Sequence, residues 1–362
     1  MKAVLMLEDG KVFTGEKLSG VNGERIGEVL FHTALVGYQE ILTDPVYAGK
    51  ILVFTSPSIG NYGICAKFSQ SNNVWAAAAV IKERSRTYSN WQAKTGFDDF
   101  ARENDFLTLT GIETRSLAMY LRKKGQMLGI ISSADVEANE LLKRIEEHKK
   151  KQLPSFLEQV SVKAITALGK AKPKQKRLAV LDLGMTRGTR KQLEKLGLHL
   201  TLLPFNTTAQ EIIELDPHGL VISSGPEQDP RSAEVCRNIA PLVGKLPILG
   251  ISAGLHIIAG CLGGETVKMK RGHHGANYPV HNPASYKGEI TCQSHSYALD
   301  AESLPKIKDL KVTEYNLNDR TVERIESKKL RFIGIQYEAK SPGFDEINPV
   351  FPSFLKMLKR VR

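Results

Sequence analysis

Cysteine is scarce in this chain, and its spacing excludes two kinds of site. The four cysteines, Cys65, Cys236, Cys261 and Cys292, are far apart and form no CxxC pair. A disulfide framework or a zinc site uses cysteines at short, regular spacing, so the sequence indicates neither. We therefore expect a reducing, cytoplasmic location and no metal site in this chain.

Long hydrophobic runs are also missing. The N-terminal residues MKAVLMLEDGKVF become acidic early, and no later stretch reaches the roughly 18 uninterrupted apolar residues of a membrane span. We expect neither a signal peptide nor a membrane-spanning segment. The 362 residues are 41% hydrophobic and 25% charged, which is typical of a globular protein with enough apolar mass for two cores and excludes disorder, collagen and repeat arrays.

Positive charge exceeds negative charge, with a net charge of +11. Part of the excess lies in two clusters in the middle third of the chain: Lys149, Lys150 and Lys151, and then Lys170, Lys172, Lys174, Lys176 and Arg177. Concentrated charge would suit an acidic partner, an anionic membrane face or nucleic acid. A solvated connector is the favoured interpretation, because no basic motif with interleaved aromatic residues accompanies the clusters.

The periodicity divides the chain in two. Residues 1–132 contain short β-like runs and a helical stretch over 114–124, and residues 134–151 read as a charged amphipathic helix. Periodicity is lost after Pro154, where Lys, Pro and Ala accumulate. We predict an N-terminal α/β domain over residues 1–153, a linker over 154–176 and a second domain over 177–362.

Strand and helix patterns alternate from Leu178 onward. Apolar runs such as LAVLDLG, GLVISSGP and LPILGIS alternate with helical patterns such as AGLHIIAGCL. This order predicts βαβ units and a doubly wound, mostly parallel sheet. Sites in such sheets lie beyond the carboxyl ends of the strands, so the loops SSGPEQDP and GISAG are where we expect chemistry.

The second of these loops carries a GxSxG motif. Gly250, Ser252 and Gly254 lie between an apolar strand and an apolar helix, which is the context of a nucleophile elbow. The alternative is a tight turn in which Ser252 caps the helix. A serine nucleophile also needs a base. His256 lies one turn further on the same helical side but is equally consistent with a core-edge residue, and His295 is equally consistent with a structural role.

Longer strings then identify a family. LEDGKVFTGE, GEVLFHTALVGYQEILTDPVYAGKI, SPSIGNYG and GIETRSLAMYLRKKG resemble the small subunit of carbamoyl phosphate synthetase. The strings LDLGMTRGTRKQL, SSGPEQDP, GISAGLHIIAG, SHSYALD and YEAKSPG resemble its class I glutamine amidotransferase domain, and the resemblance covers residues 2–360. It implies an α/β chain with a flavodoxin-like second domain. It also implies a small subunit that hydrolyses glutamine and passes ammonia to a large subunit, for pyrimidine and arginine biosynthesis.

The catalytic residues of the family are incomplete here. In the family a cysteine at the elbow is activated by a histidine in a QYHPEA-like string, but this chain has Ser252 and the string QYEAK. Glu338 is the remaining counterpart of the triad acid, and no histidine follows His295. Cys261 is nine residues from Ser252, about 13 Å along a helix, which is too far to substitute for the nucleophile.

The glutamine pocket implied by the resemblance has changed as well. A GPGDP loop whose second glycine serves the oxyanion becomes GPEQDP, where a carboxylate at Glu227 would oppose negative charge. The positions that we assign to this altered pocket are Val46, Gly225, Glu227, Ala253, His256, Ser294, Ser296 and Tyr297. Arg320 and Arg324 also replace family glycines.

Four hypotheses follow. The first is a small subunit that has lost glutaminase activity and acts as a scaffold or regulatory partner of an ammonia-using large subunit. The second is an active glutaminase that tolerates the substitutions, and the third is a paralogue recruited as a Ser252 hydrolase or as a binding module for glutamine or another small molecule. A nucleic-acid site is the fourth and is not expected. No cofactor is predicted in this chain, since ATP and metal belong to the large subunit.

Overall fold

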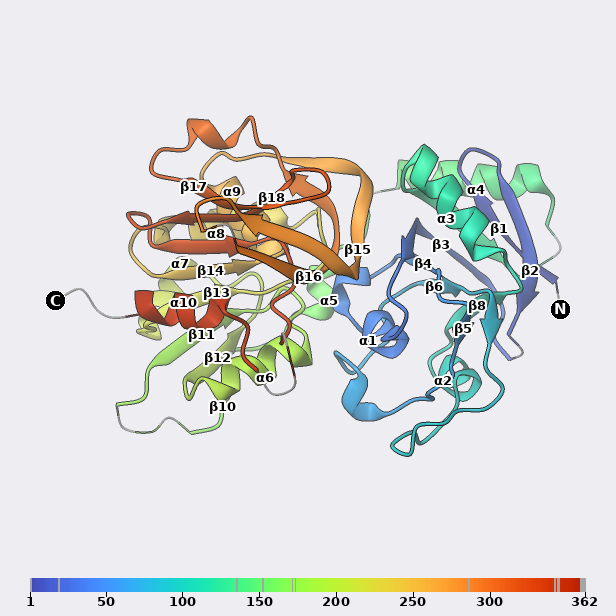
Figure 1. Cartoon of the computed structure of the whole chain (residues 1–362), viewed down its shortest axis with the longest axis horizontal. Coiled ribbons are helices and arrows are strands. Elements are labelled where there is room, and N and C mark those ends of the chain that lie inside the picture. The colour runs from blue at the N-terminus through green and yellow to red at the C-terminus, as the bar shows by residue number, and fades with distance from the viewer. Residues whose placement is uncertain are drawn as a thin grey trace. The chain divides into compact units, whose positions relative to one another are not determined.

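The computed structural model describes residues 2–18, 20–134, 136–151, 153–170, 172, 174–285, 287–341, 343 and 346–358. The chain forms two compact units, coloured along the sequence in Figure 1. The first comprises Met1–Leu153 and Met269–Gly275, and the second comprises Pro154–Lys268 and Ala276–Arg362.

A closed barrel in the order β1-β2-β8-β6-β4-β3-β9 forms the first unit. Its strands are β1 (Lys2–Leu7), β2 (Val12–Lys17), β3 (Glu24–His32), β4 (Ile51–Phe54), β6 (Ala78–Val80), β8 (Leu107–Thr110) and β9 (Met127–Ser132). β3, β4, β6 and β8 pair in parallel, whereas β1 pairs antiparallel with β2 and β9. Leu5, Val29, Ile51 and Leu107 are fully buried in one core cluster of this unit. The short β-like runs predicted within residues 1–132 are confirmed as strands.

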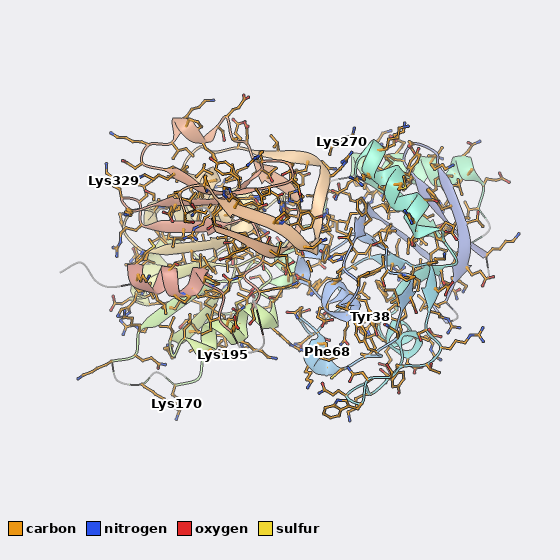
Figure 2. All side chains as sticks on the ribbon, in the orientation of Figure 1. Tyr38, Phe68, Lys170, Lys195, Lys270 and Lys329 are labelled. Carbon is orange, nitrogen blue, oxygen red and sulfur yellow. The ribbon has the colours of Figure 1, made fainter. Side chains whose placement is uncertain are left out.

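The rest of the first unit consists of short elements around the barrel. They are α1 (Tyr38–Leu42), α2 (Phe97–Glu103), α3 (Thr114–Lys124), α4 (Ala138–Lys150), the 3-10 turns at Pro45–Tyr47 and Ala66–Phe68, and a small sheet of β5 (Ser58–Ile59) and β7 (Glu83–Arg84). Tyr38 of α1, labelled in Figure 2, stacks on Tyr62 with ring centroids 4.2 Å apart. α3 has the predicted bounds, and the helix predicted over 134–151 is α4.

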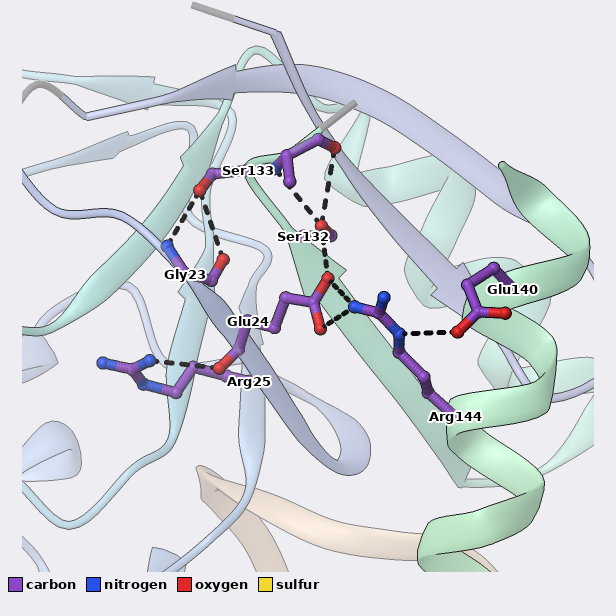
Figure 3. A network of polar contacts seen from close by, with 8 residues as sticks. Gly23, Glu24, Arg25, Ser132, Ser133, Glu140 and Arg144 are labelled. Atoms are coloured by element: carbon purple, nitrogen blue, oxygen red, sulfur yellow. Dashed lines mark hydrogen bonds and ion pairs between the residues drawn. The ribbon is translucent and has the colours of Figure 1, made fainter. Parts of the chain in front are cut away.

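An ion pair attaches α4 to the barrel (Figure 3). Arg144 on α4 contacts both carboxylate oxygens of Glu24 on β3 at 2.5 Å, and Ser132 on β9 donates to the same carboxylate at 2.9 Å. Hydrogen bonding to Glu24 raises the pKa of Arg144. Beneath this contact, Leu141 and Ile145 of α4 are buried against the barrel strands. The amphipathic pattern therefore gives α4 an apolar face for the barrel and a charged face for solvent.

The described residues of the second unit form one ten-stranded sheet in the order β10-β12-β11-β13-β14-β19-β18-β17-β15-β16. The strands are β10 (Thr166–Leu168), β11 (Arg177–Leu181), β12 (His199–Leu203), β13 (Gly219–Ile222), β14 (Ile248–Ile251), β15 (Thr266–Asn282), β16 (Lys287–Leu299), β17 (Lys311–Asn316), β18 (Val322–Ser327) and β19 (Phe332–Ile335). β12, β11, β13, β14 and β19 are parallel, which confirms the predicted parallel sheet. The strands beyond β19 extend it with antiparallel pairing.

Helices cover both faces of this sheet. They are α5 (Leu157–Val160), α6 (Arg187–Lys195), α7 (Ala209–Glu214), α8 (Ser232–Ile239), α9 (Ala253–Cys261) and α10 (Val350–Met357), with 3-10 turns at Ala240–Leu242 and Leu304–Lys306. One core cluster unites Ile212, Val235 and Leu255 of α7, α8 and α9, and a second contains Leu193 of α6 and Phe351 of α10. Two separate cores against one sheet are the packing of a doubly wound fold.

Residues 154–176, for which the sequence predicts a linker, contribute ordered elements to the second unit. α5 lies in this stretch, and β10 pairs antiparallel with β12 at the edge of the sheet. Lys170, labelled in Figure 2, is exposed, whereas Arg177 forms an ion pair with Asp216. In the other basic cluster, Lys149 pairs with Glu8 at 2.7 Å. Part of the clustered charge is thus neutralised locally. No helix among the described residues is both long and apolar enough to span a membrane.

Candidate functional site

Three chain segments leave the carboxyl edge of the parallel sheet side by side. β13 and β14 pair in parallel with Ile222 opposite Gly250, and β14 pairs with β19 with Ile251 opposite Ile335. The loop 223–230, the elbow 250–254 and the segment after Ile335 therefore begin at neighbouring strand ends. This arrangement brings together the loop SSGPEQDP, the loop GISAG and the string QYEAK, which are far apart in the sequence.

Ser252 occupies a sharp turn between β14 and α9. Its backbone has φ 51° and ψ −107°, a left-handed conformation that residues with a side chain rarely adopt. The turn is held by the Ser252 N–H, which donates to the carbonyl of Ile335 at 2.7 Å, and by the Ser252 carbonyl, which accepts from Leu255 N–H at 2.9 Å. This is the strained strand-to-helix turn expected of a nucleophile elbow.

The glycines on either side of Ser252 have no room for a side chain. A Cβ on Gly254 would lie 2.2 Å from the carbonyl oxygen of Ile222, and a Cβ on Gly250 would lie 2.5 Å from the carbonyl oxygen of Gly254. Gly225 in the neighbouring loop is as restricted, because its Cβ would lie 1.9 Å from the carbonyl oxygen of Leu183. Close backbone packing therefore dictates glycine at these positions.

The Ser252 hydroxyl does not cap the helix, so the alternative interpretation of a capping serine is wrong. Ser252 stands at the N-cap position of α9, yet its side chain accepts no hydrogen bond from the helix N–H groups. A capping serine has extended φ and ψ, which the left-handed turn does not provide. Ser252 is 3% exposed. Among the described residues its hydroxyl has no hydrogen-bond partner, and thus no base.

His256 is engaged elsewhere. Its Nε2 lies 2.8 Å from Oε1 of Gln336, the first residue after β19. Burial lowers the pKa of His256 to about 4, and the hydrogen bond to Gln336 opposes this only in part. The imidazole is therefore neutral at pH 7, and the ring nitrogen that Gln336 holds is directed to an amide rather than to Ser252.

Glu227 turns its carboxylate toward backbone N–H groups of β16. Oε2 accepts from Ser296 N–H at 2.7 Å, and Oε1 accepts from Tyr297 N–H at 3.3 Å. The carboxylate thus accepts from two backbone N–H groups that could otherwise bind an external anion. Of the residues assigned to the altered pocket, Glu227, Ser296 and Tyr297 are brought together by these bonds.

Asp229 fixes the other end of the same loop. Its Oδ2 accepts from the N–H groups of Phe156 and Leu157 at 2.7 and 3.0 Å, and its Oδ1 accepts from the Ser155 hydroxyl at 2.8 Å. These bonds attach the start of α5 to the loop. Nothing in the sequence pattern points to this contact, which joins residues more than 70 positions apart.

Glu338 and Ser294 form a separate pair. The Ser294 hydroxyl donates to Oε1 of Glu338, and Nζ of Lys340 lies 2.6 Å from Oε2. The backbone N–H of Glu338 donates to the carbonyl of Cys292 on β16 at 2.9 Å. The carboxylate is therefore held by a hydroxyl and an ammonium group, where a triad acid would hold an imidazole.

His295 is fully buried and structural in its contacts. Its Nδ1 lies 2.9 Å from the carbonyl oxygen of Tyr297, and its Nε2 lies 2.9 Å from Oε1 of Gln293. Both ring nitrogens are therefore occupied within β16. Gln293 in turn donates to the buried carboxylate of Glu323 at 2.8 Å.

Two further assigned residues lie in core positions. Val46 belongs to the first unit, in the 3-10 turn Pro45–Tyr47, where it is 6% exposed and its N–H donates to Asp44. Ala253 begins α9 and is also 6% exposed. These side chains contribute packing and no polar group.

A cavity of about 240 Å³ lies beside the elbow. Its lining includes Glu227, Gln228, Cys236, Ala253, His256 and Thr266. Glu227, Cys236 and His256 offer metal-ligating atoms, but Glu227 and His256 already hold hydrogen-bond partners. The sequence gives no sign that Gln228, Cys236 and Thr266 line this cavity, because their place there depends on how the 223–230 loop, α8, α9 and the start of β15 pack together.

Two family models match the chain. The model for the carbamoyl-phosphate synthase small chain, CPSase domain, matches residues 5–131, and the model for glutamine amidotransferase class-I matches residues 179–342. The carbamoyl phosphate synthase small chain of Listeria innocua serovar 6a is 37% identical over 360 residues, covering 99% of this chain and 97% of the relative. The chain belongs to the carbamoyl phosphate synthase small-chain family.

Other relatives in this small-chain family agree in length and similarity. The small chain of Aquifex aeolicus is 37% identical over 367 residues, covering 98% of each chain. The pyrimidine-specific small chain of Bacillus subtilis is 36% identical over 362 residues, covering 99% of this chain and 96% of the relative. Membership therefore rests on the whole chain, and it confirms the resemblance and the fold class drawn from the sequence.

Proposed function

We propose that this small-chain homologue no longer hydrolyses glutamine by the cysteine and histidine mechanism of the family. Its role is then that of a scaffold or regulatory partner of an ammonia-using large subunit. The product of that complex is carbamoyl phosphate, and pyrimidine biosynthesis is the pathway suggested by the name of the Bacillus subtilis relative. Arginine biosynthesis is a second pathway that would use this carbamoyl phosphate.

The isolated Ser252 hydroxyl is the observation that carries the proposal. A serine hydroxyl is almost wholly protonated at neutral pH and becomes a nucleophile only when a base removes its proton. His256 is bound to Gln336, and His295 is bound to Gln293 and Tyr297. Neither imidazole is therefore placed to activate Ser252.

The Glu227 carboxylate supports the same conclusion from the oxyanion side. Catalysis of acyl transfer needs donors directed at a developing negative charge. Glu227 supplies a negative charge of its own in this loop and accepts the N–H groups of Ser296 and Tyr297. A tetrahedral intermediate formed near this loop would meet repulsion.

A partner role is supported by the first unit. The small-chain CPSase model matches residues 5–131, and the relatives share nearly the full length of the chain. The name small chain implies a large chain in those proteins, so we expect one here. ATP and metal ions would be bound by that partner, and we expect this chain to need no cofactor of its own.

Reconstitution with the large subunit from the same genome tests the proposal. We expect carbamoyl phosphate synthesis from ammonia and no glutamate release from glutamine, with Ser252→Ala and the control Ser353→Ala indistinguishable from the native chain. Glutamine turnover that Ser252→Ala abolishes and Ser353→Ala retains would overturn it. Failure of the two chains to copurify would instead favour a paralogue that has taken up other chemistry.

A further inference from the structure

Two cysteines that are distant in the sequence meet between α8 and α9. Cys236 on α8 and Cys261 at the end of α9 are both free thiols. The Cys261 thiol donates to the carbonyl oxygen of Cys236 at 3.3 Å, so the two residues are in direct contact. Spacing alone gives no sign of this pair, because it arises from the packing of the two helices.

The pair is accessible from the cavity beside the elbow. Cys236 lines that cavity together with Glu227, His256 and Thr266, and both cysteines are partly exposed. Cys65 is buried in the first unit, and Cys292, which is also partly exposed, lies on β16 and is not among the residues that line this cavity. A small molecule that enters the cavity therefore meets one residue of the pair directly.

The two thiols differ in acidity. The hydrogen bond from Cys261 and the nearby positive charge of Arg237 lower the pKa of Cys236 to about 7, against the opposing effect of burial. The pKa of Cys261 is raised by the interaction with Cys236 and by burial. Cys236 is therefore the more acidic thiol of the pair, and the thiolate is the reactive form.

We propose that Cys236 and Cys261 form a dithiol modification site for small disulfides. The Cys236 thiolate attacks one sulfur of the reagent disulfide, the reagent S–S bond breaks, and one reagent thiolate leaves. Cys261 then loses its proton to solvent and attacks the Cys236 sulfur, which releases the second reagent thiolate and forms the Cys236–Cys261 bond. The cysteine pair is oxidised by two electrons, and the reagent disulfide is reduced to two thiols.

Such a bond would restrict the site described above. α8 follows the loop that carries Glu227, and α9 follows Ser252. A covalent link between these helices would fix the loop and the elbow relative to each other. The cavity between them would lose one of its free thiols at the same time.

The test uses the reduced full-length chain and 2-hydroxyethyl disulfide at about pH 7. After alkylation and proteolysis, mass spectrometry is expected to show Cys236 and Cys261 peptides joined with the loss of both thiol hydrogens. The rate should be half-maximal near pH 7. It should exceed that of an unperturbed thiol about fivefold, because greater thiolate content outweighs lower nucleophilicity.

Matched variants separate the steps. Cys261→Ser should accumulate a mixed disulfide on Cys236, Cys236→Ser should form no cross-link, and Cys292→Ser should behave as the native chain. The proposal is overturned if the native chain forms no Cys236–Cys261 cross-link, or if Cys261 reacts equally fast in Cys236→Ser. Because the native chain alone gives a decisive result, the test does not depend on the folding of any variant. It is also independent of glutaminase activity.

Discussion

Nε2 of His256 lies 2.8 Å from Oε1 of Gln336, and this contact joins the helix after the elbow to the strand end beside it. The contact spans 80 residues of sequence. It holds an imidazole of lowered pKa in the lining of the cavity beside the elbow. A pH dependence of folding follows from it.

We expect stability to fall as the pH drops from about 6.5 toward 4, and His256→Gln to remove part of that dependence. In the folded chain the pKa of His256 is about 4, against an ordinary value of 6.5. Between these pH values His256 is protonated in the unfolded chain and neutral in the folded chain. The free energy of unfolding therefore rises with pH by up to about 1.4 kcal/mol per pH unit. Urea unfolding at several pH values measures the slope. His148→Gln, on α4 of the first unit, is the control, and equal slopes for His256→Gln and the native chain would contradict the expectation.

Gly254→Ala should destabilise the chain by about 3 kcal/mol, because the new methyl group would overlap the backbone of Ile222 and force the strand or the helix to move. Gly260→Ala lies on the same helix and meets nothing within 4 Å. That control should gain up to about 1 kcal/mol from higher helix propensity. Chemical denaturation of both variants measures the difference, and similar midpoints would show that the elbow is not tightly packed.

Ser252→Gly should stabilise the chain by about 1 kcal/mol. A residue with a side chain at a positive φ costs roughly 1–3 kcal/mol, and glycine removes this strain. The greater conformational entropy of glycine in the unfolded chain offsets part of this gain. Ser224→Gly, at a buried position without a positive φ, should be destabilising. Thermal and urea unfolding of the two variants test the sign, and a loss of stability in Ser252→Gly would indicate that its side chain makes a contact worth more than the strain.

Asp229→Asn should destabilise the second unit by about 2 kcal/mol. Oδ2 accepts from the N–H groups of Phe156 and Leu157, and Oδ1 accepts from Arg231 N–H, so an asparagine with one carbonyl oxygen leaves one of these sets of N–H groups without its acceptor. We also expect faster amide hydrogen exchange at Phe156 and Leu157 or at Arg231, according to which way the amide is turned. Glu214→Gln, exposed on α7, is the control and should change stability by less than about 0.5 kcal/mol. Unchanged exchange at Phe156, Leu157 and Arg231 would contradict the anchoring role.

The sequence predicts the parallel half of the second unit well and the antiparallel half poorly. LPILGIS has the apolar pattern of a buried strand and AGLHIIAGCL that of an apolar helix, and β14 and α9 form there. β15 alternates irregularly between buried and exposed residues and includes a run of four buried positions from Gly272 to Gly275. Its pattern is set by partners distant in the chain, which no local period reveals.

The candidate site is likewise predicted from the sequence only in part. GxSxG predicts the turn at Ser252 because glycine spacing encodes a local backbone shape. The contacts of Glu227 with Ser296, of His256 with Gln336 and of Cys236 with Cys261 depend on the assembled sheet and helices. A single sequence gives residue types for such contacts and gives no distances.

The glycines around Ser252 bear on what a motif match can mean. Two of them are excluded from carrying even a methyl group by the backbone of β13 and of the elbow itself. The glycines of the G-x-S-x-G pattern are therefore required by the close approach of a strand and a helix. This requirement holds whichever residue occupies the central position. A chain without the nucleophile would still match an amidotransferase in its fold. Catalytic activity must therefore be judged from the central residue and from the residues that contact it.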